Sequence, residues 1–285
     1  MIEQPMPTPP AARAGARPQP ILAVDKVGKR FDTAEGPVTA IEEISLHVDQ
    51  GEFVSIIGPS GCGKSTLFNL IGGLLPMGEG AIRIAGEPID GPHPAIGMVF
   101  QEDATFPWRT VIDNVAFPLE LQGMLKKERL EKARHFVNLV GLSGFEGHRP
   151  AELSGGMRQR VSIARTLAHE PKLLLMDEPF ASLDEQTRLL LGDKVLQIQQ
   201  ALNQTVLLIT HNITEAVQLS DRVLIMSYRP GRTKRIVPID LPRPRTSEML
   251  SSDVFGRYVA QIWADLREEA SRGMLEAESL SRQGA

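Results

Sequence analysis

The sequence predicts an α/β fold with a parallel sheet that is covered by helices on both faces. Short, fully apolar segments alternate with helical segments over residues 173–226, as strands buried on both faces do. A glycine-rich loop joins an apolar strand at 52–57 to a helix at 64–71. Helical segments alone occupy residues 105–153, which predicts a helical subdomain inserted into the α/β core.

The remaining elements follow from the same patterns. Residues 21–31 and 38–48 alternate loosely between apolar and polar side chains, which is typical of half-buried strands. The other expected strands are residues 81–85, 96–100, 173–176, 206–210 and 222–226. The other expected helices are residues 110–122, 126–140, 155–169, 185–202 and 213–219.

The two ends of the chain differ from this pattern. Residues 1–20 contain six prolines and too little apolar surface to form a core, so we expect a flexible tail. Residues 231–285 are predicted to form a connector rich in Pro and Arg, followed by a helix over 253–270. We expect that helix to pack on its own domain, with a regulatory or dimer-contact role as the alternative.

Composition limits the classes of protein to which the chain can belong. Its 285 residues include 31 basic and 35 acidic side chains, and the net charge of -4 argues mildly against a nucleic-acid binder. One cysteine cannot form an internal disulfide, which favours a reducing compartment. The sequence has no apolar run of about 18 to 20 residues and no secretory signal, so a membrane role would require a partner.

The loop after the strand at 52–57 fits the phosphate-binding pattern G-x-x-x-x-G-K-[ST]. Its glycines let backbone N–H groups converge on an anion at a helix N-terminus. Lys64 is expected to reach the β- and γ-phosphates, and the Ser65 hydroxyl to bind Mg²⁺. A glycine turn with an incidental lysine is disfavoured, because the strand and helix lie where the pattern requires them. The expected nucleotide-binding residues are Gly58, Pro59, Ser60, Gly61, Cys62, Gly63, Lys64, Ser65 and Thr66.

Two carboxylates, Asp177 and Glu178, follow the apolar strand at 173–176. Ligands of open parallel sheets bind beyond the carboxyl ends of the strands. Asp177 suits a Mg²⁺ partner, and Glu178 suits the general base that polarises the attacking water. Two solvated acids at a strand end are the alternative, which the phosphate loop upstream makes weaker.

A second anion site is predicted where Leu-Ser-Gly-Gly-Met-Arg-Gln-Arg, residues 153–160, precedes a helix. Ser154 would cap that helix, and Gly155 and Gly156 would leave its first N–H groups accessible. One chain thus carries two phosphate-binding helix ends for what looks like one nucleotide. This pattern strongly resembles the signature sequence of ABC transporter ATP-binding subunits, which in that family completes the nucleotide site of the opposite subunit. Met157 replaces the glutamine most familiar there.

The resemblance covers residues 21–230 and implies a RecA-like P-loop NTPase core with an antiparallel β subdomain and an inserted α-helical subdomain at about 105–155. It also implies ATP and Mg²⁺ as cofactors and a homodimer of the cassette.

Four further residues match positions of the family pattern. Phe31 stands where the family places an aromatic that stacks on adenine, although a tyrosine is commoner there. Gln101 matches the glutamine that touches Mg²⁺ and the attacking water. Asp184, in Ser-Leu-Asp, matches the loop that crosses the dimer interface. His211 matches the switch histidine near the γ-phosphate.

Residues 106–111, Phe-Pro-Trp-Arg-Thr-Val, resemble the corresponding segment of importers for nitrate, sulfonate and taurine, and of related pyrimidine-precursor systems. Residues 226–232 and 241–245 also resemble that group. The resemblance implies an ATP-hydrolysing subunit, peripheral at the cytoplasmic face of the inner membrane. It would energise a separate permease, supplied indirectly by a periplasmic or extracellular substrate-binding protein that takes part in substrate choice.

Two questions stay open at this point. Phe106 and Trp108 would either contact the permease or pack inside the helical subdomain. A non-transport ABC ATPase acting on a protein complex or on nucleic acid is the alternative function, against which residues 106–111 and the slightly acidic composition argue.

Overall fold

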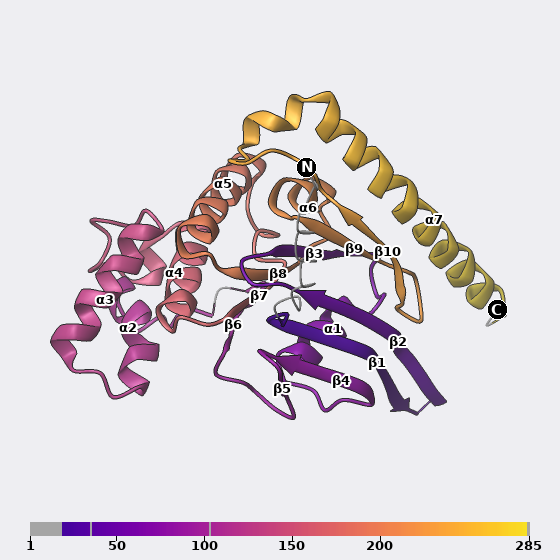
Figure 1. Ribbon diagram of the computed structural model, residues 1–285, viewed down its shortest axis with the longest axis horizontal. Coiled ribbons are helices and arrows are strands. Elements are labelled where there is room, and N and C mark those ends of the chain that lie inside the picture. Colours follow the sequence, from indigo (N-terminus) through magenta and orange to yellow (C-terminus); the bar gives the residue numbers. More distant parts are fainter. Residues whose placement is uncertain (1–18, 35, 103, 284–285) are drawn as a thin grey trace, which may run out of the picture.

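The structure is a computed structural model that describes residues 19–34, 36–102 and 104–283. The tail predicted for residues 1–20 lies almost entirely outside the described residues. The described strands form two sheets, one of six strands and one of four. Helices cover the larger sheet, extend to one side as a subdomain and end in one long C-terminal helix (Figure 1).

The six-stranded sheet has the order β10-β9-β3-β8-β7-β6. Its strands are β3 (Phe53–Ile57), β6 (Ile96–Val99), β7 (Leu173–Asp177), β8 (Thr205–Ile209), β9 (Arg222–Met226) and β10 (Thr233–Pro238). The β3 strand pairs in parallel with β8 and β9, and β7 pairs in parallel with β6 and β8, whereas β10 runs antiparallel to β9. The predicted α/β fold with a parallel sheet is therefore confirmed.

Both faces of this sheet are buried, because successive strand residues point to opposite sides. Leu173 and Leu175 belong to the core cluster around α1 (Lys64–Ile71), while Leu174 and Met176 belong to the cluster on the other face. The helices on that other face are α4 (Gly155–Ala168) and α5 (Glu185–Leu202), and α6 (Ile213–Leu219) packs farther along it. Continuous apolar strands in the sequence thus become strands with two buried faces.

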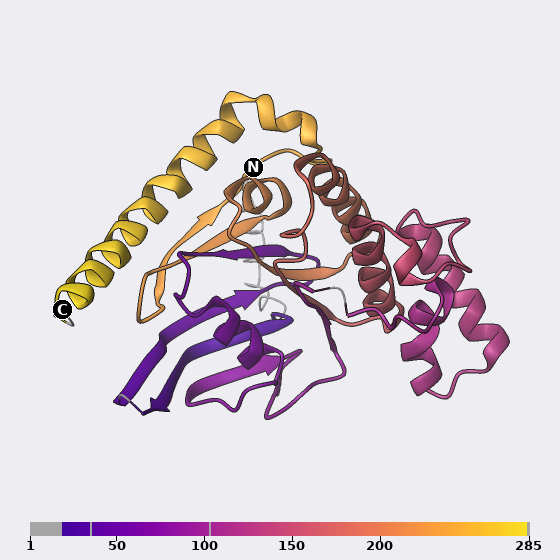
Figure 2. The ribbon, with the colours of Figure 1, turned by 180° about the vertical axis from the view of Figure 1, so that it is seen from behind.

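The second sheet is antiparallel, with the order β2-β1-β4-β5. Its strands are β1 (Leu22–Thr33), β2 (Gly36–Val48), β4 (Glu79–Ile84) and β5 (Glu87–Pro88). Its inward side chains share one core cluster with α1 and with one face of the large sheet. In the ribbon seen from behind, the indigo strands β1 and β2 lie below the orange strands β9 and β10 (Figure 2). The phosphate loop, between β3 and α1, therefore lies where the two sheets meet.

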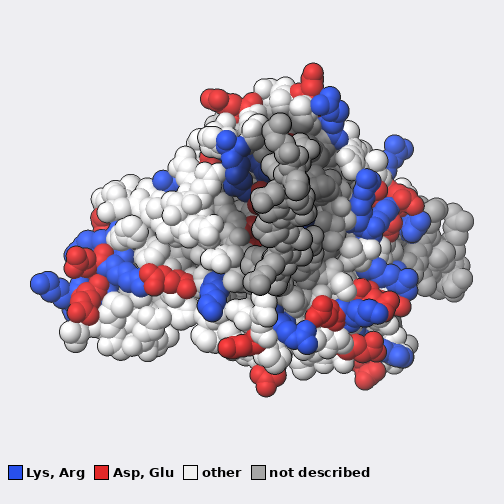
Figure 3. All heavy atoms as spheres, in the orientation of Figure 1, with Lys and Arg blue, Asp and Glu red and all other residues white. Residues whose placement is uncertain are grey.

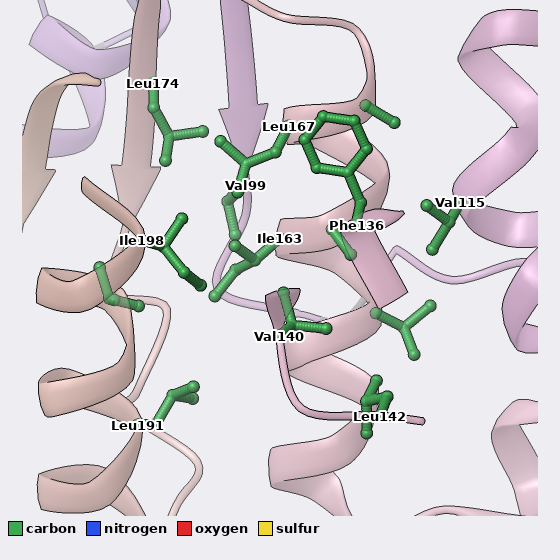
Figure 4. Close-up of a cluster of buried hydrophobic side chains, with 14 of the residues drawn as sticks. Val99, Val115, Phe136, Val140, Leu142, Ile163, Leu167, Leu174, Leu191 and Ile198 are labelled. Atoms are coloured by element: carbon green, nitrogen blue, oxygen red, sulfur yellow. The ribbon is translucent and has the colours of Figure 1, made fainter. Parts of the chain in front are cut away.

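The helices α2 (Val111–Leu121) and α3 (Lys126–Leu139) extend away from the sheets, at the left of Figure 1. A 3₁₀ turn (Pro150–Glu152) leads from them to α4. The apolar cluster in Figure 4 joins these helices to the sheet: Phe136 and Val140 approach Ile163 of α4, and Leu174 comes from β7. The helical insertion is thus packed on the α/β core and not attached by a linker alone.

The C-terminal region differs from the sequence prediction in two ways. The predicted connector contains a strand, β10, and the predicted helix is longer, since α7 (Asp253–Gln283) continues past residue 270. A 3₁₀ turn (Ser247–Ser251) precedes α7, which runs diagonally along β9 and β10 in Figure 1. Within the described residues, no helix is both long enough and apolar enough to span a bilayer.

Candidate functional site

The phosphate loop runs from the end of β3 to the first residue of α1, and its glycines are needed for its shape. Gly61 and Gly63 have φ angles of 75° and 98°, which favour glycine. A Cβ atom at Gly63 would also lie 2.8 Å from the backbone oxygen of Ala40. The loop therefore curls tightly against β2 and presents its backbone to the side where α1 begins.

Lys64, the first residue of α1, folds back over this loop. Its Nζ donates to the carbonyl oxygens of Gly58 and Pro59, at 2.8 and 3.0 Å. The Lys64 residue is 8% exposed, so its charge is concentrated at the loop. Cys62 is fully buried, and burial raises the pKa of its thiol, which fits a small filling side chain.

A cavity of about 460 Å³ opens over the loop, a size that suits a small-molecule ligand. It brings together six of the predicted loop residues and the predicted base Glu178 with three residues of β2 and one arginine. Its lining residues are Val38, Thr39, Ala40, Ser60, Gly61, Gly63, Lys64, Ser65, Thr66, Glu178 and Arg229. Backbone N–H groups, a helix N-terminus and two cationic side chains here make a setting suited to phosphates.

Glu178 is held at the end of the large sheet by two contacts. Its backbone N–H donates to the carbonyl oxygen of Ile209, at 2.8 Å. Its Oε2 lies 2.9 Å from Nδ1 of His211, so an Nδ1–H tautomer donates to the carboxylate. The φ of Glu178 is 44°, in the left-handed region that non-glycine residues rarely occupy. The backbone is thus fixed so that this carboxylate faces the cavity.

Asp177, the last residue of β7, is half-buried beside Glu178. Burial and the neighbouring charge of Glu178 raise the pKa of Asp177 to about 6, although Lys64 acts in the opposite direction. A nearby cation would relieve both the burial cost and the repulsion. Together with the Ser65 hydroxyl, this carboxylate offers the hard oxygen donors that Mg²⁺ prefers.

Metal-binding clusters of the usual kind do not occur in the part of the chain that the structure describes. No group of three or more His, Cys, Asp or Glu side chains converges there. Mg²⁺ that binds together with a nucleotide is usually held by one or two carboxylates plus substrate phosphates.

The second predicted anion site lies in another cavity. Ser154 caps α4, its hydroxyl accepting from the backbone N–H of Met157 at 3.3 Å. A cavity of about 420 Å³ is lined by Val140, Gly141, Ser154, Gly156, Arg160, Thr187, Leu190, Leu191 and Lys194. This cavity shares no lining residue with the cavity over the phosphate loop. Within one chain, the two predicted halves of a nucleotide site are therefore separate.

The other predicted residues differ in how they lie relative to these two cavities. Phe31 is half-buried on β1 opposite Val38, which lines the phosphate-loop cavity. Gln101 is exposed after β6 and does not line that cavity. Asp184 accepts from the backbone N–H of Thr187 at 3.0 Å and caps α5 beside the second cavity. Gly155 is the first residue of α4.

Trp108 and Phe106 behave differently from each other. Trp108 is 69% exposed, whereas Phe106 is half-buried and lies edge-on to Phe117 of α2, with ring centroids 4.7 Å apart. The ring of Trp108 stacks on the ring of Phe106, with ring centroids 5.4 Å apart. Phe106 thus supports an exposed Trp108 on the surface of the helical subdomain.

The sequence predicts a nucleotide contact neither for Arg229 nor for residues 38–40, which also line the phosphate-loop cavity. For residues 226–232 the sequence indicates only a resemblance to a group of importers. The sequence does contain a signal for Arg229, because Arg, Pro and Gly follow closely after the apolar strand at 222–226. Loops at the carboxyl ends of parallel strands gather around the ligand.

Comparison with known proteins agrees with this geometry. The family model described as ABC transporter matches residues 41–181. The chain is 45% identical to the nitrate import ATP-binding protein NrtD of Synechocystis sp. over 252 residues, which cover 86% of this chain and 95% of that protein. It is 42% identical to the aliphatic sulfonates import ATP-binding protein SsuB of Bacillus cereus over 240 residues, which cover 84% and 94% of the two chains.

Among solved structures, the dimeric post-hydrolysis state of the ATP-binding cassette MJ0796, bound to ADP and Pi, is similar with a TM-score of 0.68. It is 31% identical in sequence, and the match covers 78% of this chain and all of that one. Both the sequence identity and the shared fold lead to one assignment. The chain belongs to the ABC transporter family.

Proposed function

We propose that this protein is the ATP-binding and ATP-hydrolysing subunit of an ABC importer, working as a homodimer at the cytoplasmic face of the cell membrane. Its cargo would be a small anion such as nitrate, a sulfonate or taurine, because relatives named for nitrate and sulfonate import share 42 to 45% of their residues with it. A separate permease would carry the anion, and an external binding protein would deliver it.

The observation that carries the proposal is the separation of two phosphate-binding helix ends within one chain. The phosphate loop and Ser154 line cavities that have no residue in common. A second copy can supply its own Ser154, Gly155 and Gly156 to the first copy's phosphate loop. ATP would then bridge two chains, and the similarity to a dimeric cassette supports this arrangement.

The residues of the phosphate-loop cavity divide the chemistry among them. Lys64 and the loop N–H groups would bind the β- and γ-phosphates, and Ser65, Asp177 and Gln101 would hold Mg²⁺. When bound, Mg²⁺ would neutralise charge that develops on the transferred phosphoryl group. Glu178 would take a proton from the attacking water, and His211, 2.9 Å away, would orient this carboxylate. Phe31, beside Val38, would stack on adenine, and Asp184 would lie near the dimer interface.

The ATP cycle would move the two chains relative to each other. ATP stabilises the closed dimer because only that form gives the γ-phosphate a second set of donors. Loss of the γ-phosphate removes those contacts and the dimer reopens. The exposed Trp108, which stacks on Phe106 and follows Gln101 in the sequence, would transmit this motion to the permease.

The alternative function is a non-transport ABC ATPase acting on a protein complex or on nucleic acid. On the face in Figure 3, Lys and Arg lie among Asp and Glu, which differs from the single-sign basic stripe that nucleic acid favours. The similarity to import subunits argues against a protein-complex ATPase.

Co-purification and transport measurements test the proposal. The tagged protein, expressed in its own cell, should co-purify with a membrane permease. In vesicles that contain this permease and its binding protein, ATP-dependent uptake of nitrate, an alkanesulfonate or taurine is expected. Normal uptake of all three anions in cells that lack the protein would refute an anion importer of this kind.

A further inference from the structure

Arg229 follows β9 and reaches across the phosphate loop, although it lies far from that loop in the sequence. Its Nε donates to the carbonyl oxygen of Gly61 at 2.9 Å. Its side chain lines the cavity over the loop together with Lys64 and Glu178. A Cβ atom at Gly61 would lie only 2.8 Å from Nη2 of Arg229, so the glycine allows this close approach.

Most donors of Arg229 remain available. A guanidinium carries five N–H donors, of which the Gly61 contact uses one. Among the described residues, neither Nη atom has a hydrogen-bond partner. Arginine binds phosphate in a bidentate manner, and among the residues that the structure describes Glu178 is the only acidic side chain that lines this cavity. An anionic ligand on the phosphate loop would therefore lie within the field of this guanidinium.

The segment that carries Arg229 is itself fixed against the loop. The backbone N–H of Gly231 donates to the carbonyl oxygen of Ala40 at 3.0 Å, and a Cβ atom at Gly231 would lie 2.1 Å from the Cys62 oxygen. On the other side, the backbone N–H of Tyr228 donates to Oε2 of Glu269, at 2.9 Å. Tyr228, which precedes Arg229 in the sequence, is thus bonded to the C-terminal helix α7.

Glu269 is an unusual side chain for a surface helix, because it is only 3% exposed. Its second oxygen, Oε1, accepts from Nζ of Lys234 on β10 at 2.8 Å. One turn farther along α7, a Cβ atom at Gly273 would lie 2.7 Å from the Tyr228 ring, so the helix also packs closely on this segment. A buried carboxylate with both oxygens bonded fixes the helix to residues 228–234.

From these contacts we infer that Arg229 binds the phosphate chain of the nucleotide and that α7 positions it through Glu269. The inference rests on the phosphate-loop site proposed above. In this inference α7 does more than pack on its own domain, because it also supports the nucleotide site. Arg229 is a binding residue in this account, and Glu269 is a positioning residue.

The test uses the full-length protein and five variants. Titration with ATP gives Kd, titration with inorganic pyrophosphate gives the affinity for phosphates alone, and steady-state hydrolysis separates KM from kcat. Arg229→Ala should raise Kd for ATP about tenfold or more, because a hydrogen bond to a charged group is lost. Kd for pyrophosphate should rise in the same proportion. Arg232→Ala is the matched control, since Arg232 pairs with exposed Glu42 and does not line the cavity.

Glu269→Gln keeps the shape of the side chain but leaves one oxygen to serve two donors. It should raise KM for ATP several-fold and change kcat little. When Glu269→Gln is combined with Arg229→Ala, the affinity for ATP should be no lower than in Arg229→Ala alone, because both changes act on one interaction. Additive losses would overturn the role of Glu269.

Two other results separate this inference from the site on which it rests. Lys64→Ala should abolish ATP binding, and unchanged binding in that variant would refute the phosphate-loop assignment itself. If Lys64→Ala loses binding while Arg229→Ala keeps wild-type affinity for ATP and pyrophosphate, the role of Arg229 is overturned. A loss of affinity for ATP but not for pyrophosphate would equally contradict a phosphate contact.

Discussion

Replacing Asp177 by Asn should make the nucleotide-free protein more stable while it weakens Mg²⁺-dependent hydrolysis. Asp177 is half-buried beside Glu178, and both burial and this charge raise its pKa to about 6. The charged carboxylate is thus unfavourable in the folded protein, whereas an amide of the same shape carries no charge. The charged carboxylate that would bind Mg²⁺ therefore lowers the free energy of unfolding at neutral pH.

The size and pH dependence of this effect follow from the pKa. A rise from the ordinary 3.8 to about 6 corresponds to at most about 3 kcal/mol, which partial solvent exposure reduces to about 1 to 2 kcal/mol. Because the folded pKa is raised, the contribution of Asp177 to stability is fully present below pH 3.8 and is lost as the pH rises through about 6. Asparagine does not titrate, so the difference between the two proteins should grow over this pH window.

Urea unfolding of both proteins without Mg²⁺ or nucleotide, at pH 5 and at pH 8, measures this difference. The free energy of unfolding of Asp177→Asn should exceed that of the wild type by more at pH 8 than at pH 5, by about 0.5 to 1 kcal/mol, because about half of the effect has already developed at pH 5. Carboxylates whose charge does not act on Asp177 titrate alike in both proteins, so their contributions cancel. A difference that does not change with pH, or a wild type that is the more stable protein at pH 8, would contradict an unfavourable Asp177 charge in the folded protein.

Three further predictions concern the roles of single side chains. Glu178→Gln should keep ATP binding but slow hydrolysis by about 10² to 10⁴-fold, since a positioned base contributes that much, and near-normal turnover would contradict the base assignment. His211→Ala removes the 2.9 Å contact to Glu178, so single-turnover hydrolysis should fall while Kd for ATP stays near the wild-type value; equal loss of both would place His211 in binding instead. Ser154→Arg should leave ATP binding to the monomer intact and abolish hydrolysis, because its cavity is separate from the phosphate loop. Loss of binding in that variant would argue for a site within one chain.

The sequence was most informative where function depends on consecutive residues. The phosphate loop and the acidic pair each lie directly after an apolar strand, and a parallel sheet brings such strand ends to one edge. The contact between His211 and Glu178 follows from the same topology, because β7 and β8 are neighbours in the sheet. Local pattern and sheet topology together are sufficient to place these strand ends at one edge of the sheet.

The sequence was least informative where residues meet through tertiary packing. Arg229 contacts Gly61 from 168 residues away, and no local pattern predicts this pairing. Strand β10 was missed because Thr-Lys-Arg-Ile-Val-Pro carries charges and a proline, which an edge strand tolerates. The burial of Glu269 depends on Lys234 and Tyr228, so the helical pattern of α7 alone does not reveal it.

The proposed function requires that ATP binds between the phosphate loop of one copy and the Ser154 region of another. The mass of Glu178→Gln in solution, measured by light scattering with and without ATP, shows whether two copies share the nucleotide. We expect a monomer without nucleotide and a mass twice as large with ATP, reverting to the monomer mass when Ser154→Arg is added. A monomer that binds ATP stoichiometrically at every protein concentration, or an ATP-dependent dimer that Ser154→Arg leaves intact, would contradict this shared site.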